Sequence, residues 1–179
     1  ARGEIALRLI EALPAIEKEF PNVKLAVVGE GDKYKRIMHR AQEYNASREE
    51  KRVVVTGARL DTPYLMKMAD VAVGVGRVAL EAMALEKPVI IAGEAGFMGV
   101  LEPDNFHRAR QHNFSGRGSD KITDAENVAE AVKELLRDWE TRKKLGVFGR
   151  EAVKKNFSIK IMTQEILEMY HQVIEEEKI

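Results

Sequence analysis

Short apolar runs alternate along the chain with stretches in which apolar residues have helical spacing. The apolar runs, which we predict to be strands, are residues 25–28, 53–55, 70–75 and 88–93. The stretches between them, which we predict to be helices, are residues 33–45, 62–69 and 77–86. Continuous apolar strands that are each followed by a helix are typical of a parallel sheet covered on both faces. The pattern therefore predicts a single α/β domain with a Rossmann-like, doubly wound parallel sheet.

Further helices are predicted at both ends of the chain. Residues 4–19 have apolar residues at helical spacing, and we expect Pro14 to kink or shorten this helix. Residues 124–157 are predicted to form two helices, with Asp124 as the cap of the first. A last amphipathic helix is predicted to begin at Ser158. The domain should therefore carry extra helices at its C-terminal end.

Residues 93–120 break the alternation of strands and helices. This segment is long, glycine-rich and only partly periodic, and such loops inside a compact domain are usually functional or mobile. In doubly wound folds, ligands bind at the carboxyl ends of the strands. We therefore expect the loops that leave the predicted strands to converge on one rim. These loops are residues 29–32, 56–61, 74–77 and 93–99.

Composition restricts the class of protein without naming it. The chain has 179 residues, of which 45% are hydrophobic and 32% are charged, as in a soluble globular domain. Lys+Arg and Asp+Glu are 29 each, so no net charge favours nucleic acid. There is no cysteine, and His107 and His112 lack further ligands nearby, so we expect no metal site. The chain begins without Met, and we interpret it as part of a longer protein.

Two glycine-rich loops are weaker candidates for a ligand site. Gly29 and Gly31 fit a dinucleotide fingerprint, but Tyr34 occupies the place of its third glycine. A tight turn from strand to helix is the favoured interpretation of that loop. The glycines of GEAGFMG (93–99) fit a ligand loop and a flexible loop equally well.

The segment GVGRVALEAMA (74–84) is the most informative candidate. Gly76 precedes a predicted helix, and the first N–H groups of a helix are unpaired and partly positive, which suits a phosphate. Arg77 adds positive charge at this point. Glu81 follows one turn later, and a carboxylate accepts hydrogen bonds from the two hydroxyls of a ribose. The alternative interpretation is a surface ion pair between Arg77 and Glu81.

Taken together, these segments resemble the C-terminal, donor-binding domain of GT-B glycosyltransferases, most of all the retaining family 4, also called group 1. The resemblance covers residues 20–95 well and the helical remainder loosely, and it implies that residues 1–179 form the nucleotide-sugar-binding half of such an enzyme. The matching pieces occur in the family's order, as VVGEG (27–31), VVVTG (53–57), YLMKMADV (64–71), GVGRVALEAMA (74–84) and EKPVIIAG (86–93).

The resemblance assigns the best-matched residues to the ribose and the diphosphate of the donor. Glu81 matches the second Glu of the family's Glu-x7-Glu motif, which binds the ribose. The backbone of Gly76, Arg77, Val78 and Ala79 matches the helix start that meets the diphosphate.

Other residues are implied to complete the donor site. Arg59 and Leu60 lie in the loop that matches the stretch beside the nucleobase. Gly29 and Glu30, from the matching VVGEG segment, are included among the donor contacts. Arg2 stands where the family's phosphate element usually has a lysine.

The chain departs from the family in two ways. Val73 stands where the first Glu of the motif normally contacts the donor sugar. The N-terminal acceptor domain is absent from residues 1–179, and a GT-B active site lies between the two domains. We therefore expect the isolated chain to be inactive and prone to self-association through its last helix, and we assign no catalytic residue.

The expected function is that of the donor-binding half of a hexosyltransferase that moves a sugar from a nucleoside-diphosphate sugar to an acceptor, with retention. The expected partners are the nucleotide sugar and the acceptor domain of the same protein, with no nucleic acid, no cofactor and no membrane span. A cytoplasmic location is expected, with the missing domain as a route to the inner membrane surface. Two alternatives stay open: a sugar-nucleotide epimerase of the same architecture, and a non-catalytic nucleotide-binding or assembly module.

Overall fold

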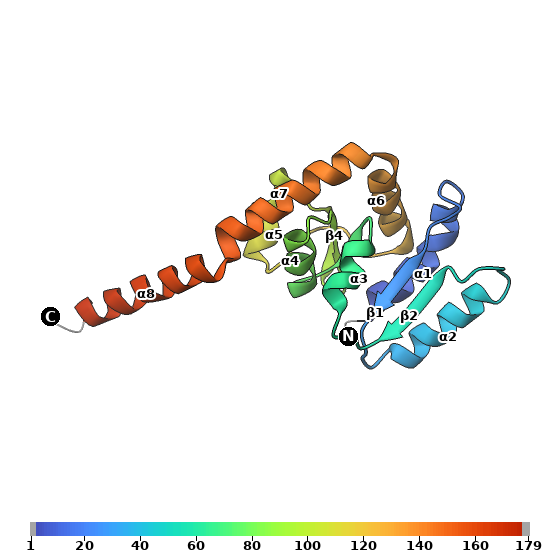
Figure 1. Ribbon diagram of the computed structural model, residues 1–179, viewed down its shortest axis with the longest axis horizontal. Helices are drawn as coiled ribbons and strands as arrows, with labels where there is room; N and C mark the ends of the chain where they lie inside the picture. Colours follow the sequence, from blue (N-terminus) through green and yellow to red (C-terminus); the bar gives the residue numbers. More distant parts are fainter. Residues whose placement is uncertain (1–2, 177–179) are drawn as a thin grey trace.

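Helices and strands alternate through most of the chain, as the apolar pattern predicts. The computed structural model describes residues 3–176 (Figure 1). The strands are β1 (Leu25–Val28), β2 (Val53–Gly57), β3 (Ala72–Gly74), β4 (Val89–Gly93) and β5 (Gly96–Val100). The helices are α1 (Glu4–Glu17), α2 (Tyr34–Asn45), α3 (Thr62–Met68), α4 (Arg77–Ala84), α5 (Pro103–Gln111), α6 (Ala125–Arg137), α7 (Trp139–Phe157) and α8 (Ile159–Glu176).

The five strands form two separate sheets. β1 and β2 pair in parallel, with Leu25 opposite Val53. β3 and β4 also pair in parallel, with Ala72 opposite Val89, and β5 adds to β4 in the antiparallel direction. The predicted α/β class with parallel strands is confirmed. Within residues 3–176, however, no ladder of hydrogen bonds joins β1 to β3, so the sheet is divided where the prediction had it continuous.

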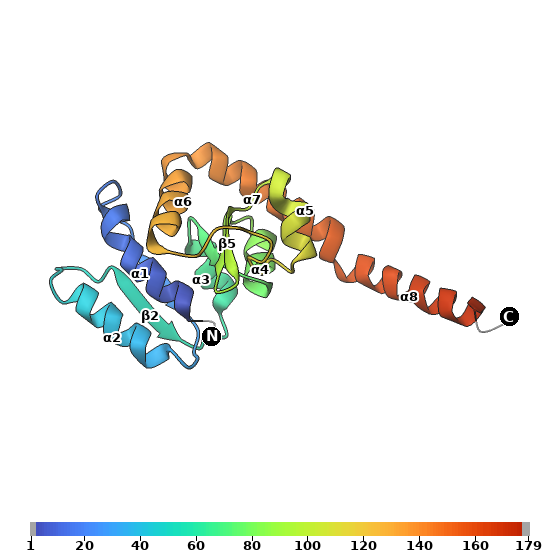
Figure 2. The same ribbon diagram turned by 180° about the vertical axis from the view of Figure 1, so that it is seen from behind.

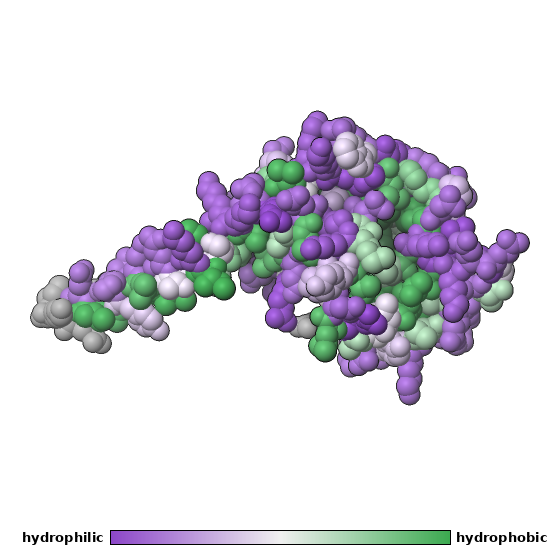
Figure 3. All heavy atoms as spheres, in the orientation of Figure 1, coloured by the Kyte–Doolittle hydropathy of each residue, from purple (hydrophilic) through white to green (hydrophobic). Residues whose placement is uncertain are grey.

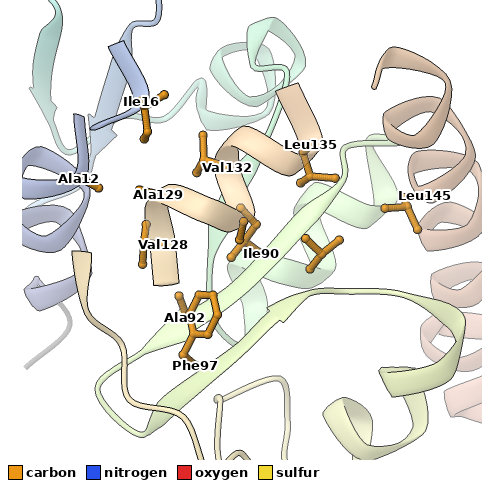
Figure 4. Close-up of a cluster of buried hydrophobic side chains, with 12 residues drawn as sticks. Ala12, Ile16, Ile90, Ala92, Phe97, Val128, Ala129, Val132, Leu135 and Leu145 are labelled. Carbon is orange, nitrogen blue, oxygen red and sulfur yellow. The ribbon is translucent and has the colours of Figure 1, made fainter. Parts of the chain in front are cut away.

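Helix α1 packs against both sheets and connects them. One side of the helix carries Ala6, Leu7, Ile10 and Leu13, which are buried against α2, β1 and β2. Another side carries Ala12 and Ile16, which are buried against α6, β4 and β5. Figure 4 shows this second cluster, and Figure 2 shows α1 lying over β2 on the face opposite to that of Figure 1. The burial of α1 on two sides explains its uninterrupted length.

Two expectations from the sequence are wrong. Pro14 does not shorten α1, which runs on to Glu17. The segment 93–120 is not one long loop, because it contains β5 and α5. Strand β5 is held by its pairing with β4, and α5 begins at a capping box between Glu102 and Asn105. Both stabilising features depend on specific partners and leave little trace in the periodicity of the sequence.

The predicted C-terminal helices are confirmed. The carboxylate of Asp124 accepts a hydrogen bond of 2.8 Å from the N–H of Asn127 and so caps α6. The last helix follows Ser158 and extends away from the body (Figure 1). Its exposed apolar residues are Ile159, Met162, Ile166, Leu167, Met169, Tyr170, Val173 and Ile174. No helix within residues 3–176 combines the length and apolar character needed to cross a membrane.

A half-buried carboxylate ties α1 to α2. Glu17 accepts hydrogen bonds of 2.7 Å from the hydroxyl of Tyr44 and 2.9 Å from the guanidinium of Arg48. Burial alone would raise the pKa of Glu17. The two hydrogen bonds lower the pKa by more than burial raises it, so the net pKa lies below the ordinary value. Burial and the bond to Glu17 raise the pKa of Tyr44 to about 12.

We expect Glu17→Gln to lower the free energy of unfolding by about 1.5 kcal/mol at neutral pH, because a hydrogen-bonded charge is lost. Since the pKa of the folded carboxyl is lowered, its contribution is present above the unfolded pKa and disappears as the pH falls through the folded pKa. Urea unfolding should therefore show that the difference in free energy of unfolding between the variant and the parent chain is smaller at acidic pH than at neutral pH. The control is Glu19→Gln, which removes an exposed ion pair with Arg137 and should change stability little. Equal losses for both variants would contradict the expectation.

Candidate functional site

The first turn of α1 lies at the carboxyl ends of the strands. Lys33, in the loop after β1, donates a hydrogen bond to the carboxylate of Glu4 in α1. The Lys33 ammonium is also 3.6 Å from the carboxylate of Glu94, in the turn after β4. This hydrogen bond lowers the pKa of Glu4 and raises the pKa of Lys33. Loops of both sheets therefore meet at one rim, as the sequence predicts for the carboxyl edge.

The start of α4 lies on the same edge, after β3. Gly76 has φ 58° and ψ −124°, a conformation that residues with a side chain rarely adopt, and it turns the chain from strand to helix. Its carbonyl accepts hydrogen bonds from the N–H groups of Ala79 and Leu80, at 3.1 and 3.3 Å. No side chain caps the helix. Within residues 3–176, nothing accepts a hydrogen bond from the N–H groups of Arg77 and Val78, so they remain available to an anion.

The predicted residues of α4 divide between solvent and core. The side chain of Arg77 is 90% exposed and that of Glu81 is 51% exposed, with 4.0 Å between their charged atoms. Val78 is also exposed, whereas Ala79 is fully buried and its N–H is bonded within the helix. The ion pair expected as the alternative is therefore present. Both of its members still face solvent beside the open helix start, where a ligand would reach them.

The other predicted residues lie on the β1–β2 side of the rim. The N–H of Gly29 donates to the carbonyl of Gly57 at 2.9 Å, which joins the loops after β1 and β2, and Glu30 is exposed beside this contact. Arg59 donates two hydrogen bonds to Asp61, of 2.8 and 2.6 Å, and Leu60 is fully exposed. These loops make no hydrogen bond with the start of α4 among the described residues. Arg2 lies outside the described residues.

A segment that the sequence did not single out lies against α4. The N–H of Gly76 donates to the carbonyl of Phe114 at 3.0 Å. Asn113 and Phe114 both have positive φ, of 52° and 51°, which is unusual for residues with side chains. The ring of Phe114 is buried between those of Phe106 and Phe157 and holds the segment in place. The exposed Arg117 follows on the same segment.

An open cleft of about 500 Å³ lies at the rim beside the β4–β5 turn. Its charged lining residues are Glu4, Arg8, Lys33, Glu94, Asp120 and Lys121. The segment 93–99, which the sequence left undecided between ligand loop and flexible loop, contains the two-residue connection between β4 and β5 and most of β5. Its residues 93–96 line this cleft. Lys33 was missed because its role depends on contacts with residues distant in the sequence.

Several known proteins are similar to this chain in sequence or in fold. A spore coat protein SA of Bacillus subtilis is 27% identical over 92% of this chain and 44% of its own length. The crystal structure of Anabaena Alr3699/HepE in complex with UDP and glucose matches 92% of this chain and 44% of its own, with a TM-score of 0.67 and 19% identity. The C-terminal domain of the glycosyl transferase group 1 family protein LpcC from Francisella tularensis matches over 88% of this chain and 80% of its own, with a TM-score of 0.63 and 22% identity.

These matches place the chain within larger proteins of one architecture. The chain spans less than half the length of the curated relative, and it matches most of a domain that was solved by itself. The fold is therefore that of the C-terminal half of GT-B glycosyltransferases. The sequence model of the Glycosyl transferases group 1 family matches residues 6–152. Because this match covers most of the chain, the protein belongs to the glycosyl transferases group 1 family.

Proposed function

We propose that the chain binds the nucleoside-diphosphate-sugar donor of a glycosyltransferase, in which an N-terminal domain binds the acceptor and a hexosyl group is transferred with retention. The observation that carries this proposal is the uncapped start of α4, with Arg77 and Glu81 exposed beside it. The complex of Alr3699/HepE with UDP and glucose, on the same fold, supports a donor of this class.

The groups at the start of α4 suit the two parts of a nucleoside diphosphate. The N–H groups of Arg77 and Val78 and the positive end of the helix favour the diphosphate. The carboxylate of Glu81 lies one turn further along and accepts hydrogen bonds from the ribose hydroxyls. The exposed Leu60 on the β2 loop offers an apolar contact to the base.

The same groups provide the chemistry of transfer. When the bond between the sugar and the diphosphate breaks, negative charge develops on the departing phosphate oxygen. The helix start provides fixed N–H groups, and the Arg77 guanidinium provides a positive charge. Both stabilise the developing negative charge more than they stabilise the intact nucleotide sugar. The acceptor hydroxyl, in the cleft between this chain and the N-terminal domain, forms a bond to the sugar carbon that leaves the diphosphate, and its proton passes to the departing phosphate oxygen.

One observation favours a second candidate, a module that binds a nucleotide without transferring a sugar. Val73 is partly buried and packs against the core formed by α6 and β4. The position where the family places a sugar-contacting Glu thus serves packing here. Product analysis of the full-length protein separates the possibilities, since transfer to an acceptor, inversion of the sugar in place and no reaction are distinct outcomes.

Calorimetric titration of the chain with UDP and GDP tests the proposal directly. We expect one of them to bind. Arg77→Ala should weaken the binding of that nucleoside diphosphate about fivefold or more, and should change the affinity for the corresponding monophosphate little. Arg40→Ala is the control, because Arg40 is an exposed cation on α2 that is already paired with Glu43. Failure of every nucleotide to bind a chain with an intact circular dichroism spectrum would overturn the proposal.

A further inference from the structure

The turn between β3 and α4 is held by a backbone hydrogen bond from a distant segment. The N–H of Gly76 donates to the carbonyl of Phe114 at 3.0 Å. Gly76 has a φ of 58° and no side chain, so nothing in the residue itself keeps its peptide in one orientation. The N–H groups of Arg77 and Val78 follow directly, so their direction depends on how firmly Gly76 is held.

The end of α5 does not by itself explain the conformation of Phe114. The N–H of Asn113 donates to the carbonyl of Arg110 at 3.0 Å, and the N–H of Phe114 donates to that of Ala109 at 2.7 Å. These bonds form a Schellman motif, in which the first residue after the helix cap has a positive φ, and Asn113 is that residue. The motif does not require a positive φ at the next residue. Phe114 nevertheless has a φ of 51°, which is costly for an aromatic residue, and in this conformation its carbonyl reaches Gly76.

The ring of Phe114 holds the residue in this strained conformation, since backbone strain persists only where the surroundings determine it. Phe114 is 2% exposed, and its ring centroid lies 5.9 Å from that of Phe106 on α5 and 5.8 Å from that of Phe157 on α7. It belongs to the same buried cluster as Ala79, in the first turn of α4. In Figure 3, polar residues (purple) cover the outer side of α7, and apolar residues (green) gather below it toward α4. Three helices therefore fix this ring.

The residue after Phe114 is fixed against the end of β4. A Cβ at Gly93 would lie 2.7 Å from the side chain of Val75 and 3.5 Å from the carbonyl oxygen of Ser115. A side chain at position 93 would therefore push apart the turn after β3 and the segment after α5, which both approach β4 at this point. The Phe114 carbonyl is thus held from two sides, by the buried cluster and by the sheet.

We propose that Phe114 is a positioning residue for the donor: its carbonyl fixes Gly76 and so directs the N–H groups of Arg77 and Val78 toward the diphosphate. This inference rests on the proposed function, because it concerns the same helix start. Donors that are fixed before the ligand arrives need no reorganisation when charge develops on the phosphate. The strain at Phe114 therefore serves to preorganise the site.

The first test compares Phe114→Leu with Phe106→Leu. Both changes remove a ring from one cluster, but only residue 114 holds Gly76, so Phe106→Leu is the matched control. In Phe114→Leu, hydrogen exchange at the Gly76 amide should become about tenfold faster or more, while exchange at the Leu101 amide, bonded to Val89, should change little. Calorimetry should show that Phe114→Leu lowers the ratio of the affinities for the nucleoside diphosphate, UDP or GDP, and for its monophosphate about fivefold or more. Phe106→Leu should leave the Gly76 amide and this ratio unchanged, even where it lowers the urea midpoint.

The second test changes only the backbone preference of the segment. Asn113 is exposed, so its side chain can be replaced without removing a group from the core. Asn113→Gly keeps a positive φ readily, whereas Asn113→Val disfavours it because valine is β-branched. We expect Asn113→Gly to match the parent chain in hydrogen exchange at Gly76 and in the affinity ratio. Asn113→Val should change both in the same direction as Phe114→Leu.

The results separate this inference from the proposed function. If the parent chain binds the diphosphate, an unchanged ratio in Phe114→Leu, or an equal fall in Phe106→Leu, would overturn the positioning role alone. Equal weakening by both Asn113 variants would also overturn it, because the asparagine amide would then contact the ligand itself. If the parent chain bound neither UDP nor GDP, the proposed function would be wrong, and the positioning role would be wrong with it.

Discussion

Gly116→Ala should destabilise the protein by about 3 kcal/mol or more, the largest effect we expect from a single methyl group. A Cβ at position 116 would lie 2.3 Å from the carbonyl oxygen of Gly96 and 2.9 Å from its carbonyl carbon. These are backbone atoms of β5, so they cannot turn aside as a side chain would. The φ of Gly116 is also +85°, which adds strain for alanine.

The effect should reach the donor site, because Gly116 belongs to the same segment as Phe114, whose carbonyl holds Gly76. The control is Gly118→Ala. Gly118 has a similar φ of +79°, but its Cβ would meet only the exposed side chain of His112, which is free to turn away. We expect a loss of about 1 kcal/mol for the control. Urea unfolding measures both variants, and similar losses would show that the contact with Gly96 is not tight.

Glu81→Gln should weaken binding of the nucleoside diphosphate about tenfold to a hundredfold. Charge-assisted hydrogen bonds contribute about 1.5–3 kcal/mol, and an amide replaces a carboxylate that accepts from two hydroxyls. Helix α4 should be unaffected, since the Glu81 side chain is half exposed and its partner Arg77 lies 4.0 Å away. Calorimetry with the nucleotide that binds the parent chain measures the change.

A ligand without the ribose hydroxyls makes this test specific. The 2′,3′-dideoxy form of the same nucleotide should bind the parent chain and the Glu81→Gln variant with equal affinity. Glu165→Gln, an exposed position on α8, is the matched control and should change neither affinity. If Glu81→Gln weakened the binding of both ligands equally, the carboxylate would act on the diphosphate or on the helix, and the ribose assignment would be wrong.

The elements that local chemistry determines were predictable from the sequence. The runs LAVV and VVVTG are strands, and Asp124 caps α6 through the N–H of Asn127. The elements missed were those that depend on partners. β5 carries two glycines and is held by its ladder with β4, and α1 continues through Pro14 because it is buried on two sides.

The candidate site was also predictable only in part. Gly76, Arg77 and Glu81 are close in sequence, so their spacing alone indicates a helix start with a charge pair one turn apart. The segment around Phe114 and the cluster of Lys33 with Glu4 were not predictable, because they join residues that are distant in the chain. A close pattern in the sequence reveals one element of a site, whereas the walls contributed by other loops appear only in the folded structure.

The position of α1 also constrains the order in which the chain folds. Residues 4–57, which include α1, and residues 72–100 each form a sheet by closing short loops, and each of these halves has a buried cluster of its own. Docking α1 onto α6 brings together residues such as Glu19 and Arg137, which are 118 positions apart. Closing so long a loop carries the greater entropic cost and slows folding. The two halves should therefore form first, and the docking of α1 should complete the native state.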